Sequence, residues 1–143
     1  SDSFYRLIED PKVPNVIGQS LFTFFCWGFA FPAIIIGVDL TDNVLMFLAG
    51  AGICFVGAAA AFKGDSMTHS VHMIGAYSGV LFSQLAIAFL FKMYYVNIIF
   101  ILFAILALVF RKKLKDNQVW WQEIAAFASI LYVYAVKLYG LFA

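Results

Sequence analysis

The chain has 143 residues, of which 64% are hydrophobic and 12% are charged, and its mean hydropathy is +0.95. A soluble domain carries about 25% charged and about 45–50% apolar residues, so the composition excludes a protein with a water-facing surface. The formal net charge of +1 gives no reason to expect nucleic acid as a partner. A chain surrounded by lipid does not need a polar surface. The composition therefore predicts an integral membrane protein.

The first fifteen residues, SDSFYRLIEDPKVPN, form a polar segment of mixed charge. They lack the basic start, apolar run and small-residue cleavage site of a signal peptide. Ser1 is a natural residue to follow a removed initiator methionine, so we expect this segment to lie close to the native start. The predicted organisation is a polar segment, residues 1–15, followed by one transmembrane domain, residues 16–143.

Apolar runs predict an all-α membrane helix bundle with five transmembrane helices. A helix needs about 20 residues to cross roughly 30 Å of hydrocarbon, and it satisfies its own backbone polar groups there. The alternating pattern of a membrane β-barrel is absent from the sequence. The short stretches GVDLTDN, KGDSMT, KM and RKKLKDNQ separate the runs. The predicted spans are residues 16–36, 44–62, 69–91, 94–110 and 120–142.

The distribution of lysine and arginine predicts the orientation of these spans. With five spans, the N-terminal segment, the second loop and the fourth loop share one side of the membrane. The opposite side carries only Lys92 and Lys137. The bias predicts a cytoplasmic N-terminus, in a cell membrane or an organelle inner membrane. The shared side carries the other seven basic residues, Arg6, Lys12, Lys63, Arg111, Lys112, Lys113 and Lys115.

Small residues at intervals of four predict seams where helices pack closely, because small side chains let helix backbones approach each other in lipid. Two such stripes lie in the second and third spans. Cys26 in the first span lies at a depth similar to that of a cysteine in the second, and buried cysteines are usually inert apolar residues. The predicted helix-packing residues are Gly50, Cys54, Ala58, Gly75, Gly79 and Ser83.

Three polar side chains within the spans need an explanation, since polar groups are expensive in a membrane. Lys137 lies about a turn and a half from the end of the last span, where it can extend to the interface. Glu123 lies one turn into the same span, close to the positive end of the helix. Gln84 is the deepest strongly polar residue, and it can bridge to a neighbouring helix or line a cavity.

Both histidines, His69 and His72, open the third span. Residues three apart on a helix share a face, so we expect this face to turn into the bundle and its imidazoles to form structural hydrogen bonds. Together with Met67 and Met73 they also make a soft ligand set that suits copper. A proton-handling role near neutral pH is a third interpretation. Haem is disfavoured, because neighbours on one helix face cannot reach opposite haem faces.

The stretch AAAFKGDSMTHSVHMIGAYSGVLFSQLAIAF resembles part of the DRAM/FRAG-type membrane protein family. In that family a V-H-x-x-G-A element opens a helix after a short polar loop, and residues 71–76 match it. Trp120 and Glu123 match a W-x-x-E element of the last helix. The resemblance implies a polytopic protein linked to autophagy, lipid or membrane organisation, without an established catalytic chemistry. The family has six helices and an extracytoplasmic histidine loop, and the predictions for this chain differ in both respects.

No nucleophile–base pair, phosphate-binding loop or carboxylate dyad stands out, so an enzymatic function has little support in the sequence. The main hypothesis is a non-enzymatic membrane protein that packs against itself, against lipid or against partner subunits of a larger complex. A metal-binding redox subunit, with the methionines and histidines as ligands, is a further alternative. Another is a transporter or channel component, lined by Ser78, Ser83, Gln84 and a helix kink at Pro32.

Overall fold

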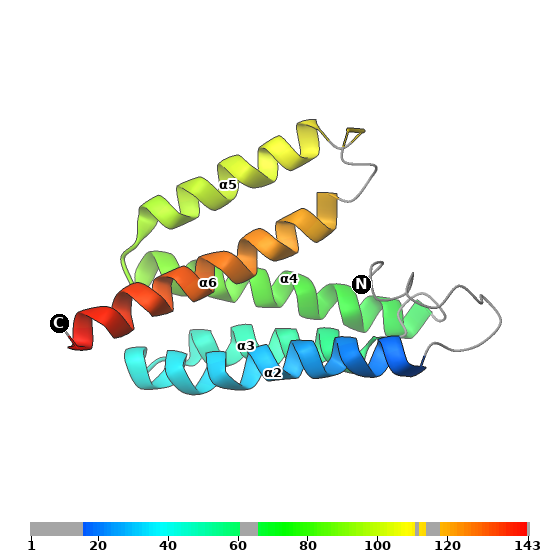
Figure 1. The fold of residues 1–143 in the computed structure, drawn as a ribbon, viewed down its shortest axis with the longest axis horizontal. Coiled ribbons are helices and arrows are strands. Elements are labelled where there is room, and N and C mark those ends of the chain that lie inside the picture. Colours follow the sequence, from blue (N-terminus) through cyan, green and yellow to red (C-terminus); the bar gives the residue numbers. More distant parts are fainter. Residues whose placement is uncertain (1–15, 61–65, 111, 114–117, 143) are drawn as a thin grey trace. The chain divides into compact units, whose positions relative to one another are not determined.

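The computed structural model of the protein describes residues 16–60, 66–110, 112–113 and 118–142. The ordered elements in these ranges are all helices, which confirms the all-α prediction. The predicted polar segment, residues 1–15, and five of the basic residues used for the orientation lie outside the described residues. In chain order the helices are α2 (Val16–Thr41), α3 (Val44–Ala58), α4 (Ser66–Phe89), α5 (Tyr94–Val109) and α6 (Gln118–Phe142) (Figure 1).

The turn between α2 and α3 shows how the first two helices end and begin. α2 continues through Pro32 and stops at Thr41, five residues later than the predicted end of the first span. Asp42 then adopts a left-handed conformation with φ 48°. The Asn43 side chain accepts a hydrogen bond of 3.0 Å from the backbone N–H of Leu45, which caps the start of α3. This cap makes a tight connection of two residues between the helices.

Three helices are long and apolar enough to cross a membrane, over Val16–Thr41, Ser66–Phe89 and Trp121–Leu141. α3 and α5 are apolar but shorter, with 15 and 16 residues. At a rise of 1.5 Å per residue, their lengths are about 22 and about 24 Å. Length and composition therefore identify three helices suited to a bilayer, which is compatible with an integral membrane protein.

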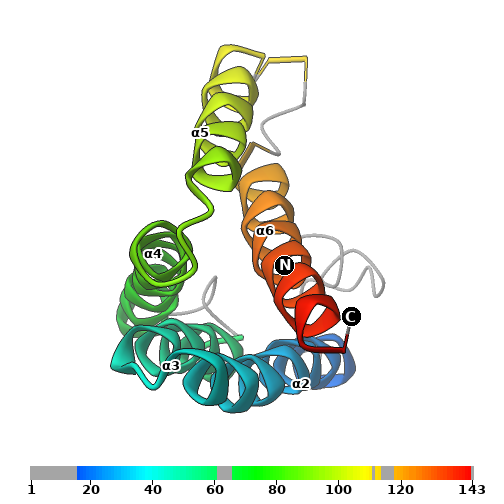
Figure 2. The ribbon, with the colours of Figure 1, turned by 90° about the vertical axis from the view of Figure 1, so that its left-hand side faces the viewer.

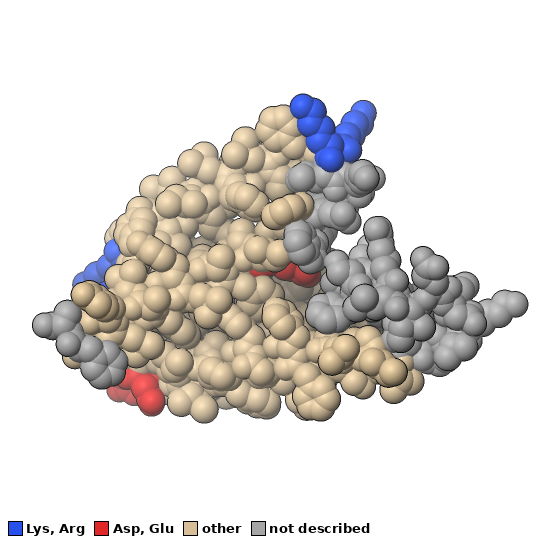
Figure 3. Space-filling view, in the orientation of Figure 1, with Lys and Arg blue, Asp and Glu red and all other residues tan. Residues whose placement is uncertain are grey.

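The described surface is largely apolar. On the face drawn in Figure 3, blue and red side chains occupy small areas and the helices are otherwise tan. Phe24 on α2 is 73% exposed, and Val109 on α5 is 68% exposed. A water-soluble protein rarely exposes apolar side chains in continuous patches of this kind, so the surface fits a lipid environment.

The helices form two compact units, residues 1–79 and residues 80–143. In the first unit α2 and α3 lie side by side (Figure 2). Two side chains of α2 donate hydrogen bonds to carbonyl groups near the end of α3. The Thr23 hydroxyl reaches Gly57 O at 2.7 Å, and the Trp27 indole N–H reaches Cys54 O at 3.1 Å. These bonds fix α2 along α3.

α3 and the first half of α4 make the closest backbone approach described. A Cβ atom added at Gly52 would lie 2.6 Å from the backbone nitrogen of Gly79 and 2.7 Å from the carbonyl oxygen of Gly75. A Cβ atom at Gly75 would in turn lie 2.7 Å from Gly52 O. Real Cβ atoms do not come this close to backbone atoms, so the contact requires glycine on both helices. The contact lies within the first unit.

The stripe of small residues on α3 differs from the prediction. Gly50 is buried and Cys54 is half-buried, whereas Ala58 is exposed. Steps of four residues turn by about 40° around a helix, so the third member of such a stripe leaves the contact face. Gly57 occupies the contact instead, because its Cα faces Cys26 and Trp27 of α2. On α4 the predicted stripe Gly75, Gly79 and Ser83 is buried along its length.

We expect Gly52→Ala to lower the free energy of unfolding by about 1–3 kcal/mol, because its methyl group would meet backbone atoms that cannot move aside. Gly28→Ala is the matched control, since a Cβ atom there has nothing within 4 Å. That change should be neutral or stabilising by about 0.5–1 kcal/mol. Helical circular dichroism during unfolding in detergent measures both. Equal effects of the two substitutions would contradict the close approach of α3 and α4.

Candidate functional site

A hydrogen-bonded polar cluster joins the three helices of the second unit. Gln84 of α4 donates from Nε2 to the hydroxyl of Ser129 on α6, at 2.9 Å. Asn97 of α5 donates from Nδ2 to Gln84 Oε1 at 3.0 Å and to Gln84 O at 2.9 Å. The Ser129 hydroxyl donates in turn to Ala126 O at 2.7 Å. Each donor therefore meets an acceptor, in a chain that runs from α5 through α4 to α6.

One hydrogen-bond acceptor in this cluster is not used. Asn97 Oδ1 is buried and accepts no hydrogen bond from the described residues. A buried acceptor without a partner costs about 1–3 kcal/mol. The two hydrogen bonds donated by the Nδ2 of the same side chain offset part of that cost. The cluster therefore fixes the relative positions of the helices more than it adds to their stability.

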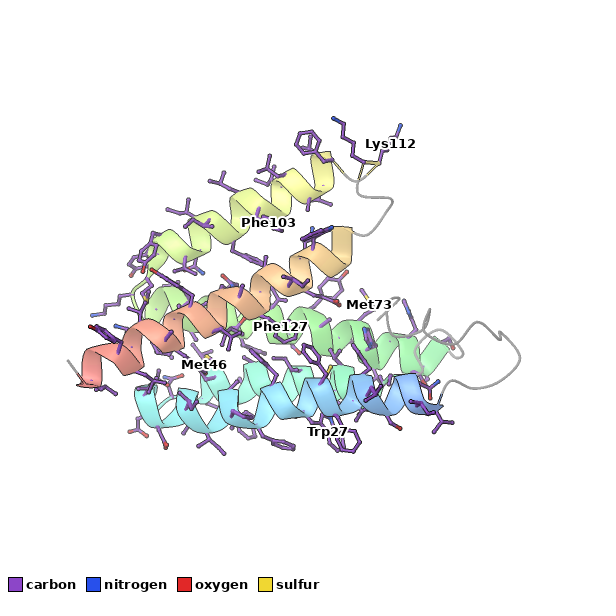
Figure 4. The ribbon with its side chains drawn as sticks, in the orientation of Figure 1. Trp27, Met46, Met73, Phe103, Lys112 and Phe127 are labelled. Atoms are coloured by element: carbon purple, nitrogen blue, oxygen red, sulfur yellow. The ribbon has the colours of Figure 1, made fainter. Side chains whose placement is uncertain are left out.

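A groove of about 480 Å³ lies between α5 and α6, next to the cluster. Its α5 wall includes Val96, Ile99 and Phe103, the last of which is labelled in Figure 4. Its α6 wall includes small side chains such as Ala125 and Ala128. These small side chains leave space beside the larger ones of α5, and Trp121, Ile124 and Tyr132 complete the α6 wall. The volume is in the range of pockets that hold small molecules or single lipid chains.

Two tyrosines close the polar end of this groove. Tyr95 of α5 and Tyr132 of α6 both line it, and their hydroxyl oxygens are 3.3 Å apart. Their rings meet edge to face, with centroids 6.3 Å apart. Ser129 also lines the groove, but its hydroxyl is already used in the polar cluster. The tyrosine pair therefore has hydrogen-bonding capacity left at its end of the groove.

The two histidines differ in burial. His72 is only 3% exposed, and its Nδ1 lies 3.3 Å from the carbonyl oxygen of Ala59, just after α3. Since a carbonyl only accepts, Nδ1 carries the proton and donates. The ring of His72 stacks on Phe22 of α2, with centroids 6.1 Å apart. His69 is exposed on the same helix, and it is His72 that contacts Ala59 and Phe22.

The two methionines beside the histidines differ in exposure. Met67 is 72% exposed, and Met73, labelled in Figure 4, is half-buried. Among the described residues, no group of three or more His, Cys, Asp or Glu side chains is placed to hold a metal ion. The copper hypothesis for Met67, His69, His72 and Met73 stays a prediction.

The two charged candidates lie on α6. Glu123 is half-buried near the start of the helix, and Lys137 is exposed near its end. Neither contributes to the hydrogen bonds described for the polar cluster. Their separation along α6 is 14 residues, or about 21 Å. They are thus placed near opposite ends of the helix.

Sequence reasoning identified Gln84 but missed its two partners, Asn97 and Ser129. A signal for Asn97 exists, because it is an amide within the otherwise apolar and aromatic stretch YYVNIIF. Ser129 has a weaker signal, since serine is common in membrane helices and can bond to its own backbone. Comparison with known proteins finds no matching family, no matching curated protein and no matching solved structure.

A double-mutant cycle tests the cluster. We expect Gln84→Leu and Ser129→Ala to be coupled by about 0.6–1.7 kcal/mol, the range measured for hydrogen bonds between membrane helices. Ser70→Ala serves as the control, since the Ser70 hydroxyl is exposed and bonds to Ser66 O of its own helix. Unfolding in detergent, monitored by circular dichroism, supplies the free energies. A coupling energy no larger than that between Gln84→Leu and Ser70→Ala would show that the cluster does not join α4 to α6.

Proposed function

We propose that this chain is a non-enzymatic integral membrane protein that acts by packing its helices against lipid, further copies of itself or partner subunits. The observation that carries the proposal is the exposure of large apolar side chains on every helix. Ordered polar contacts, by contrast, serve to join helices, as in the cluster around Gln84. Such a protein presents little to water and much to a membrane.

In this proposal all five helices cross the bilayer, with the N-terminus in the cytoplasm. The crossing of α5 needs a test, because this helix has only 16 residues. Its flanking lysines support the crossing. Lys92 is exposed before its start, and Lys112 is exposed beyond its C-terminal end (Figure 4). Lysines at both ends of an apolar helix are typical of a membrane span.

Labelling from the two sides of the membrane tests this topology. In a variant without Cys26 and Cys54, we expect a membrane-impermeant maleimide to reach Lys92→Cys and Lys112→Cys from opposite sides of sealed vesicles. Permeabilised vesicles, in which both positions should react, are the control. If both cysteines react from the same side of sealed vesicles, α5 does not cross the membrane.

α5 exposes many large apolar side chains that are available for packing. Few of its side chains are buried, and those described as buried are Val96 and Ala107. The exposed ones cover one broad face, about half of the helix circumference, and this face is available to neighbours. They include Ile98, Ile99, Ile101, Leu102, Ile105, Leu106, Leu108 and Val109. We therefore place the contact with other chains on α5.

The mass of the purified particle tests this packing role. In mild detergent we expect a protein mass above the 16.0 kDa of one chain. The double variant Leu102→Ala, Leu106→Ala should shift the population toward single chains, because it removes apolar contacts on α5. Leu21→Ala on α2 is the control, since Leu21 is also exposed. A strictly monomeric particle with no copurifying partner would contradict the proposal.

The alternative functions have weaker support. Ser78 and Ser83 donate their hydroxyls to carbonyl groups of their own helix, and Gln84 is engaged with its neighbours. These side chains are therefore not available to line a solute pathway. A metal-binding role would require the exposed His69 to converge with the buried His72. The resemblance to the DRAM/FRAG-type family stays a prediction, and it also favours membrane organisation over catalysis.

A further inference from the structure

The groove between α5 and α6 has the shape of a slot. From Tyr95 to Phe103 it extends about 12 Å along α5, and from Trp121 to Tyr132 about 16 Å along α6. Both walls follow the helix axes, so the space is long and narrow in the direction that a lipid chain takes in a bilayer. A compact ligand would leave much of this length unfilled.

The interior of the slot suits hydrocarbon. Its walls are aliphatic and aromatic between the tyrosine pair and Trp121, apart from Ser129. The Ser129 hydroxyl accepts from Gln84 and donates to Ala126 O. Ser129 therefore offers no unused hydrogen to a ligand, and a polar molecule in the slot would lose its hydrogen bonds to water without replacement. The occupant of the interior is thus apolar.

Two lysines adjoin a ring contact between the start of α5 and the last turns of α6, near the tyrosine end of the slot. The rings of Phe91 and Tyr134 meet there, with centroids 6.0 Å apart, which places the start of α5 beside the last turns of α6. Lys92 follows Phe91 directly, and Lys137 lies one turn beyond Tyr134. Both lysines are exposed. Among the described residues of this unit the only acidic one is Glu123, which lies toward the opposite end of α6.

The hydroxyl pair adds a hydrogen-bond donor at the same end. With the Tyr95 and Tyr132 oxygens 3.3 Å apart, one hydroxyl donates to the other, and the second keeps its hydrogen for another acceptor. A phosphate group is such an acceptor, and it pairs well with lysine ammonium groups. Charge and hydrogen bonding therefore select an anion at the tyrosine end of an apolar slot.

We infer that the groove between α5 and α6 binds one anionic phospholipid. An acyl chain fills the slot between Tyr95 and Trp121, and the phosphate lies at the tyrosine end, within the field of Lys92 and Lys137. This inference rests on the proposed membrane function and names the class of lipid that the second unit recognises. At the opposite end, the groove wall of α5 ends at Phe103, about 9 Å along the helix from its last residue, Val109, and Lys112 lies beyond that end. Glu123 opposes an anion there.

The test uses the full chain, purified in mild detergent and washed free of endogenous lipid. Dioleoyl phosphatidylglycerol is compared with dioleoyl phosphatidylcholine, which has the same acyl chains but no net charge. We expect phosphatidylglycerol to raise the unfolding midpoint by about 5 °C more than phosphatidylcholine does, since a ligand that binds the folded state stabilises it. Native mass spectrometry should retain a single phosphatidylglycerol on each chain.

Two lysine variants locate the headgroup. The double variant Lys92→Gln, Lys137→Gln should remove the advantage of phosphatidylglycerol while leaving the effect of phosphatidylcholine. The matched variant Lys112→Gln, Lys113→Gln also removes two positive charges, but beyond the other end of α5. In this variant phosphatidylglycerol should still stabilise more than phosphatidylcholine. Equal stabilisation of the wild-type chain by the two lipids overturns the inference, as does an advantage that survives loss of Lys92 and Lys137. Loss of the advantage in the Lys112 and Lys113 variant overturns it too.

A groove-filling variant tests the acyl site separately. Ala128 lines the groove and is exposed, so Ala128→Leu fills the slot without crowding a buried core. It should abolish retention of phosphatidylglycerol in native mass spectra, whereas Ala135→Leu, at another exposed position of α6, should not. Retention of the lipid by the Ala128 variant overturns the inference. A chain that stays dispersed without detergent contradicts the proposed function itself, so the two failures are distinguishable.

Discussion

Lipid tails are as apolar as leucine, so apolar side chains gain little by moving from lipid to a contact between two helices. A chain with this surface must therefore hold its helices together by close backbone approach and by polar contacts. The contact of Gly52 with Gly75 and Gly79 is the clearest case of the first means, because atoms of one backbone occupy the space that a side chain would need on the other. The packing of α3 on α4 depends on the absence of side chains at Gly52 and Gly75.

The two units use these means in different proportions. In the first, glycines let the backbones meet, and Thr23 and Trp27 add hydrogen bonds to carbonyl groups of α3. In the second, larger side chains keep α5 and α6 further apart, and the polar cluster around Gln84 supplies a directional link. The groove follows from that difference, since helices held by a few hydrogen bonds need not close along their whole length. The second unit is therefore the part of the chain suited to take up a ligand.

Apolar runs and turn residues were sufficient to predict where the helices lie, because both follow from local sequence. They did not predict that α2 runs on to Thr41, since its end depends on the backbone of Asp42 and the cap at Asn43. Spacing suggested that His69 and His72 act together, but residues three apart differ by about 60° around a helix. That angle is enough to expose one and bury the other. The hydrogen-bond partners of Gln84 depend on how three helices pack together. The periodicity of residues along a single helix carries no information about that packing.

The brevity of α3 and α5 has a consequence for the surrounding membrane. Under the proposed topology, helices of about 22 and about 24 Å cross a hydrocarbon layer of about 30 Å, next to helices that match or exceed that thickness. The bilayer would have to thin beside the short helices, or their ends would have to draw in water and headgroups. Hydrophobic mismatch of this kind favours thin membranes and draws short helices of separate molecules together. The lengths of two helices would then influence in which cellular membrane the protein accumulates.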